Sequence, residues 1–136
     1  MPGKKKHRDP EYALHIFHHN DERTGKSSVV ILVRTIKEFT SFNYEILLNA
    51  SMTERTIQVK ILGLRTTPLI MPGIGPARGR KDFDNLGGEY TVQISKLDGE
   101  TNEFHLSVSA SQIALYGSPA RPFIAVSNES VLLPQP

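Results

Sequence analysis

The sequence predicts an all-β protein built from short strands that alternate apolar and polar residues. Within Arg55–Leu62, the apolar residues Ile57, Val59 and Ile61 occupy every second position, which is the period of a strand with one buried face. Turn-forming residues separate several segments of this kind, and no convincing long helix is indicated. Because two half-apolar sheets must bury their faces against each other, we expect a two-sheet antiparallel β-sandwich of seven or eight short strands. A partly open β-barrel is the alternative.

The first strands are expected near the N-terminus. Tyr12–His19 forms the first strand and leads into a polar turn at Asn20–Lys26. The next strand is Ser28–Ile36, whose central run Val29–Val33 is entirely apolar and β-branched apart from one leucine. A run without polar positions is typical of a strand covered on both faces, so this strand should be central.

The next two segments predict a hairpin. Phe42–Ala50 and Arg55–Leu62 both alternate, and Ser51–Glu54 forms the turn between them. The first of these segments also fits a helical stripe, but a strand is favoured because its neighbour alternates strictly. The residues of that stripe are Tyr44, Leu47, Leu48 and Met52.

The C-terminal half contains the clearest hairpin. Glu89–Leu97 and Glu103–Ser111 alternate regularly, and a glycine in the connection Asp98–Gly99 tolerates the positive φ that such turns need. Ile113–Tyr116 and Phe123–Ser127 are expected to be shorter strands. Together with the first half, these segments supply the strands of the predicted fold.

One interval, residues 63–88, lacks the alternation and is expected to be a long loop insertion. Its middle places four apolar side chains among two prolines and two glycines, and three cations follow within four residues. Prolines remove hydrogen-bond donors and glycines add freedom, so we do not expect this segment to pair as a normal strand. Long loops in compact domains are commonly functional. The expected partner-binding residues are Leu69, Ile70, Met71, Ile74, Arg78, Arg80 and Lys81.

Length and charge indicate one small domain. A chain of 136 residues with 38% hydrophobic and 22% charged residues can bury a core. The net charge is only +2, yet residues 1–8 carry +4 and residues 65–81 carry another +4, so the remainder carries −6. We therefore divide the chain into a basic flexible arm at 1–10, one domain at 11–133 and a tail at 134–136.

Composition also limits the location and chemistry. The chain has no cysteine, which excludes disulfides, thiolate metal sites and cysteine nucleophiles. The charged N-terminus lacks the apolar run of a secretory signal, and the longest apolar run is far shorter than the ~20 residues that span a bilayer. We expect a cytoplasmic protein without a membrane partner.

Motifs for cofactors and metals are incomplete. Thr24–Ser27 resembles the end of a phosphate-binding loop, but Asn20 replaces its first glycine and a strand follows. On a strand, His15 and His19 stand about 13 Å apart and His18 points away, so the three do not converge on one metal. Asp82, Asp84 and Asn85 supply too few oxygens for calcium.

These observations favour binding over catalysis. No nucleophile elbow is present, and we expect no enzyme activity, cofactor or metal. The leading hypothesis is a non-catalytic interaction or structural module that binds another protein, or itself, through residues 69–81 or a sheet edge. The alternative is polyanion or nucleic-acid binding through the basic arm and the Arg78–Lys81 cluster.

Overall fold

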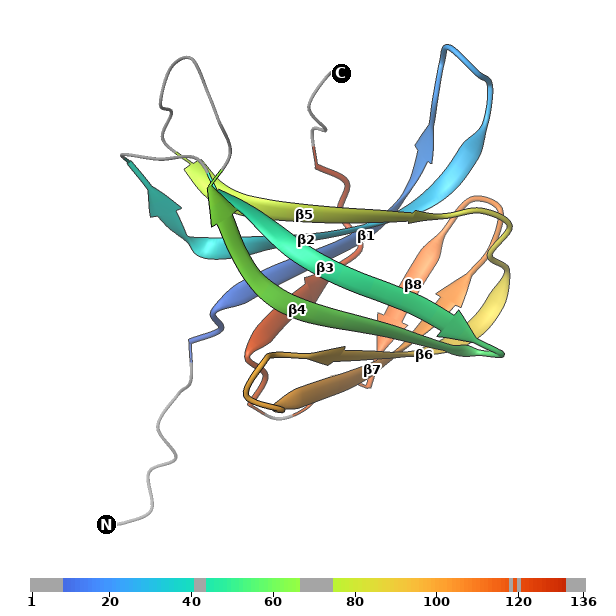
Figure 1. Cartoon of the computed structure of the whole chain (residues 1–136). Helices are drawn as coiled ribbons and strands as arrows, with labels where there is room; N and C mark the ends of the chain where they lie inside the picture. Colours follow the sequence, from blue (N-terminus) through green and yellow to red (C-terminus); the bar gives the residue numbers. More distant parts are fainter. Residues whose placement is uncertain (1–8, 41–43, 67–74, 118, 120, 132–136) are drawn as a thin grey trace.

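The computed structural model describes residues 9–40, 44–66, 75–117, 119 and 121–131. Nine strands form one sheet with the order β8-β7-β6-β4-β3-β5-β2-β1-β9 (Figure 1). The all-β prediction is therefore confirmed, and none of the described residues forms a helix of the length and apolarity that crosses a membrane. The strands are β1 (Tyr12–Asn20), β2 (Ser27–Phe39), β3 (Tyr44–Thr53), β4 (Thr56–Thr66), β5 (Gly75–Phe83), β6 (Gly88–Ser95), β7 (Thr101–Val108), β8 (Ile113–Tyr116) and β9 (Ile124–Ser127).

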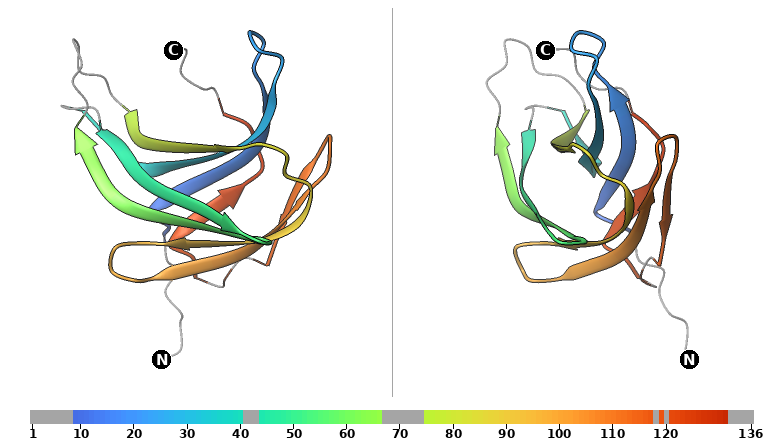
Figure 2. Two further views of the ribbon diagram at one scale, coloured as in Figure 1. Left: turned by 45° about the vertical axis from the view of Figure 1, so that its right-hand side comes forward. Right: turned by 90° about the vertical axis from the view of Figure 1, so that its right-hand side faces the viewer.

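The sheet curls into a nearly closed barrel. Its two edge strands approach each other, and β1 contacts β8 across the seam (Figure 2). Asn128, directly after β9, donates a hydrogen bond from Nδ2 to the carbonyl oxygen of Ile113 at 2.7 Å. This arrangement agrees with the partly open barrel given as the alternative, since the strands form one continuous sheet and not two separate ones.

The short join between β3 and β5 gives the barrel two layers, which is the feature it shares with the predicted two-sheet sandwich. These parallel neighbours share a single registered pair, Glu45 opposite Arg78, and this short join divides the sheet into two layers. One layer is β9-β1-β2-β5 and the other is β3-β4-β6-β7-β8. Most neighbouring strands are antiparallel, as expected, whereas β1 and β9, β3 and β5, and β4 and β6 are parallel.

The interior of the barrel is filled by apolar side chains. Alternate positions on every long strand point inward, which is what the sequence pattern predicted. The predicted central run Val29–Val33 is buried on both faces, as expected: one face joins the interior, and the other joins a small outer cluster of Phe17, Val30 and Leu32, against which Val131 packs. The largest fully buried side chains of the interior are Phe104, Phe123, Leu14, Ile16, Ile31, Ile57, Ile94, Leu106 and Ile124.

The segment 63–88 is not the loop that the sequence suggested. Strand β4 continues to Thr66, and β5 occupies Gly75–Phe83 in the sheet between β2 and β3. The inward positions of β5 are small, Ala77 and Gly79, because β3 crosses close to them. Phe83, at the end of β5, is the one large apolar residue of this strand that packs against the interior, so the segment gave no alternating signal and the strand was missed. Residues 67–74 lie outside the described residues, as do the tail at 134–136 and residues 1–8 of the arm.

Candidate functional site

The predicted contact residues fall into two groups. Leu69, Ile70, Met71 and Ile74 lie outside the described residues, so their role stays a prediction. Arg78, Arg80 and Lys81 lie on β5. Because Arg78 and Arg80 alternate with the buried Ala77 and Gly79, both face the outside of the barrel, whereas Lys81 starts from the opposite side of the strand.

The structure places Arg78 in a row of charged residues that crosses four strands. Arg65 on β4 pairs in register with Glu45 on β3 and forms an ion pair with it. Glu45 is in register with Arg78 on β5, and Arg78 is in register with Arg34 on β2. We call these four residues the arginine row. The sequence could not reveal it, since its members are spread over 45 positions from Arg34 to Arg78 and meet only through the strand order.

His15 continues the arginine row onto β1. Its side chain is on the outer face yet only 8% exposed, and Arg34 Nε donates a hydrogen bond to His15 Nε2 at 3.1 Å. Burial lowers the pKa of His15, Arg34 and Arg78 lower it further, and Glu129 opposes them in part. His15 is therefore neutral at pH 7, with its proton on Nδ1.

The charges around the arginine row are unevenly compensated. Arg80 forms a two-pronged ion pair with Asp82, with both N–O distances at 2.7 Å, and this contact raises the pKa of Arg80. Arg65 is neutralised by Glu45. Arg34, by contrast, is partly buried, and no carboxylate of the described residues lies within ion-pair distance of it.

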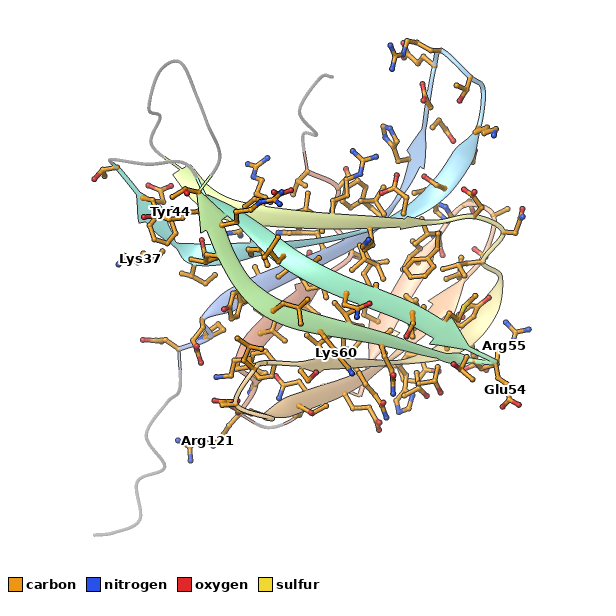
Figure 3. The ribbon with its side chains drawn as sticks, in the orientation of Figure 1. Lys37, Tyr44, Glu54, Arg55, Lys60 and Arg121 are labelled. Atoms are coloured by element: carbon orange, nitrogen blue, oxygen red, sulfur yellow. The ribbon has the colours of Figure 1, made fainter. Side chains whose placement is uncertain are left out.

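A second surface lies at one end of the barrel, where four strand ends gather. There β2 and β4 end and β3 and β5 begin, and Figure 3 shows Tyr44 in this region with Lys37 near it. The rings of Phe39 and Tyr44 pack with their centroids 4.6 Å apart. Leu62 and Leu64 on β4 are each 42% exposed. We call Phe39, Tyr44, Leu62 and Leu64 the apolar end.

A β-bulge accounts for the exposure at the apolar end. The register of β3 with β4 shifts between Leu47 and Leu48, so that Leu62 has no direct partner and Gly63 takes a positive φ of 138°. A bulge turns the strand locally and redirects its side chains. Leu64 is in register with the buried Ile46, but it lies beyond the packed interior near the end of β4.

A shallow pocket of about 540 Å³ opens at the barrel seam, between β1, β8 and the segment after β9. His18 and Glu129 are among its lining residues. The His18 Nε2 atom lies 2.9 Å from the carbonyl oxygen of Ser109 and donates to it, so that nitrogen is not available as a base. In the described part of the chain, no three histidine or carboxylate side chains are grouped closely enough to hold a metal ion.

Comparisons with known proteins do not assign this chain to a family. No protein-family model, curated protein or solved structure matches it. The apolar end and the barrel seam are therefore the places from which function is inferred.

Proposed function

We propose that the chain is a non-catalytic interaction module that binds a protein surface through the apolar end, either on another protein or on a second copy of itself. The observation that carries the proposal is the exposure of two leucines, Leu62 and Leu64, on β4 at the end of the barrel where the rings of Phe39 and Tyr44 also pack. Single exposed apolar residues are common, but neighbouring ones at a strand end are typical of contact surfaces. The module is expected in the cytoplasm, where a chain without cysteine needs no disulfide.

The sequence next to the apolar end supports the same surface. Strand β4 ends at Thr66, and the predicted contact residues Leu69, Ile70, Met71 and Ile74 follow before β5 begins at Gly75. Burying one methylene group contributes about 0.8 kcal/mol, so two leucines in a partner's pocket can supply a large part of a modest affinity.

The test compares two apolar-to-polar changes. The Leu62→Ser/Leu64→Ser double variant removes the exposed leucines of the apolar end. Met52→Ser is the matched control, because Met52 is 43% exposed and lies at the opposite end of β3 from Tyr44. Sedimentation velocity over a range of concentrations measures self-association, and affinity capture from an extract with quantitative mass spectrometry measures partners.

The proposal expects self-association, or capture of one partner, that Met52→Ser retains and the double variant loses. Circular dichroism must show that both variants keep the β fold. If the wild type stays monomeric and no captured protein distinguishes the double variant from the control, the proposal is wrong.

A further inference from the structure

An apolar cluster lies on the outside of the barrel. Phe17 on β1 and Val30 on β2 are a registered pair, and both alternate with residues of the interior, so they face outward together with Leu32. All three are nearly inaccessible to solvent, although Arg80 and Asp82, their neighbours on β5, are exposed. The outer cluster is thus apolar surface of the sheet that a further part of the chain covers.

The covering element is the segment that follows β9, residues 128–131, which we call the strap. Val131 packs against the outer cluster and is itself half-buried. Asn128 donates its side-chain hydrogen bond to the carbonyl oxygen of Ile113 on β8, and the strap backbone is within reach of the His15 ring. The strap belongs to no strand, so separate contacts hold it and not a backbone ladder. Contacts of this kind open more readily than a sheet does.

The strap leaves space unfilled at its side. The pocket at the barrel seam lies between the strap and β8, and its lining includes Phe17 of the outer cluster, Ile113 and Ala114 of β8, and Ser130 of the strap. Because Phe17 belongs to both, the pocket continues the outer cluster. A peptide with a larger apolar side chain in place of Ser130 would therefore gain contacts that the strap does not make.

We infer that the outer cluster and the pocket bind an extended apolar peptide of a partner protein, and that the strap occupies this docking site until the partner displaces it. The strap shows the kind of ligand that fits, a non-helical segment with an apolar residue at the position of Val131. Displacement requires the partner to bind more tightly than the strap, and filling the pocket supplies that difference.

This docking site is separate from the apolar end. Val30 and Leu32 lie in the first half of β2, whereas the apolar end contains the last residue of that strand, Phe39. The inference therefore does not rest on the function proposed for the apolar end, and either can fail without the other.

Two full-length variants change the cover and leave the docking site intact. Val131→Asp removes the apolar contact of the strap and should open the site. Ser130→Asp is the matched control, because it adds the same charge at the neighbouring, exposed position and keeps Val131. Circular dichroism must show that both variants keep the β fold. If Val131→Asp does not, Val131→Ser takes its place.

The probes are two synthetic peptides with the sequence of residues 127–136, one unchanged and one with Ser130→Leu. Each is titrated into the proteins and followed by the NMR signals of Phe17, Val30 and Leu32. Both should bind Val131→Asp saturably, and the Ser130→Leu peptide about tenfold more tightly, because its leucine fills the pocket. The wild type and Ser130→Asp should bind each peptide about tenfold more weakly than Val131→Asp does, since their own strap competes for the site.

A third protein variant should act in the opposite direction. Ser130→Leu in the full chain fills the pocket from the strap itself. It should raise the urea concentration at the midpoint of unfolding and weaken peptide binding below the wild-type level. Leu62→Ser/Leu64→Ser should bind the peptides as the wild type does, which separates this result from the test of the apolar end.

The inference is overturned if the peptides bind Val131→Asp no more tightly than Ser130→Asp, or if they shift only signals outside the outer cluster and the pocket. Sedimentation velocity without peptide supplies a further check. Self-association of Val131→Asp that the wild type lacks would show that a second copy covers the opened cluster, and this result would also contradict a partner peptide as its ligand.

Discussion

The carbonyl oxygen of Ile46 on β3 occupies the space next to Gly79 on β5 where a side chain would begin. A Cβ atom at residue 79 would lie 2.5 Å from this oxygen and 3.0 Å from Cγ of Leu48. Gly79 is buried, and its position is next to Arg78, where β3 and β5 form their single registered pair. The absence of a side chain at residue 79 is therefore what lets the two layers of the barrel meet.

We accordingly expect Gly79→Ala to destabilise the protein by about 1–3 kcal/mol, because the backbone of β3 must move to admit the methyl group. Gly75→Ala is the matched control on the same strand. A Cβ there meets nothing within 4 Å and its φ is not positive, so it should leave stability unchanged or raise it by roughly 0.4–1 kcal/mol. Urea unfolding followed by circular dichroism measures both, and equal stability of the two variants would contradict this account of the join.

The irregular stretch of the β2–β5 ladder depends on one threonine. The register shifts between Arg34 and Glu38, and the buried Thr35 spans the gap: its Oγ1 accepts a hydrogen bond from the backbone N–H of Ala77 at 2.9 Å and donates to the carbonyl of Lys37 at 2.7 Å. Thr35→Val keeps the shape but removes the hydrogen-bond partner of the N–H of the buried Ala77 and of the Lys37 carbonyl.

We expect Thr35→Val to lower the free energy of unfolding by about 1–3 kcal/mol. Thr35→Ser retains the hydroxyl and should recover most of the loss. Thr53→Val, at an exposed strand position, controls for the change in residue type. The prediction fails if Thr35→Val and Thr53→Val unfold at the same urea concentration.

A buried asparagine fixes the chain at the entrance to β9. The Oδ1 atom of Asn102 accepts the backbone N–H of Phe123 at 2.9 Å, and Asn102 is only 6% exposed. The fully buried Phe123 in turn accepts a hydrogen bond from the backbone of Glu11 at 2.7 Å. Asn102→Ala should therefore lower the free energy of unfolding by about 1–3 kcal/mol.

The control for this change is Asn49→Ala, which alters an exposed position of β3. Amide hydrogen exchange adds a local measurement: faster exchange should be concentrated at Phe123 and in β9. Uniformly faster exchange throughout the barrel would show that Asn102 acts on the whole fold and not on this junction.

The sequence was sufficient to predict the strands whose inward residues are large. Eight predicted strands match observed ones within a few residues at each end; the pair at Glu89–Leu97 and Glu103–Ser111, for example, corresponds to β6 and β7. Alternation reports burial directly when the inward side chain is a valine or isoleucine. In the middle of β5 the inward residues are the small Ala77 and Gly79. Ile46 and Leu48 of β3 fill the space beside Gly79. The sequence of β5 alone does not show that β3 is its neighbour.

The residues of the candidate sites were harder to predict from the sequence than the strands. The sequence analysis selected Arg78 and Arg80 as cations of a loop. In the structure the neighbours of Arg78 are set by strand register, which places Arg34 on one side of it and Glu45 on the other. Local sequence does not specify which distant strands become neighbours. His15 was considered as a metal ligand or a catalytic group; the signal that was missed is its outward position on a strand whose neighbouring outward residues are apolar.

The neutral state of His15 leads to a prediction about pH. Burial and the adjacent arginines lower the pKa of His15 in the folded protein, despite the opposing effect of Glu129. The unfolded chain, with a histidine pKa of about 6.5, therefore binds more protons than the folded protein in the acidic range. The contribution of His15 to stability is present above about pH 6.5 and is lost as the pH falls through the lower folded pKa.

We expect the free energy of unfolding of the wild type to fall between about pH 7.5 and about pH 5.5, a range above the pKa values of ordinary carboxylates. His15→Gln should reduce this dependence, because a glutamine oxygen can accept the hydrogen bond from Arg34 without titrating. His19→Gln is the control on the same face of β1 and should retain the wild-type slope. Urea unfolding at several pH values measures all three proteins. If His15→Gln and His19→Gln show the same slope, His15 is not the group that couples protons to folding.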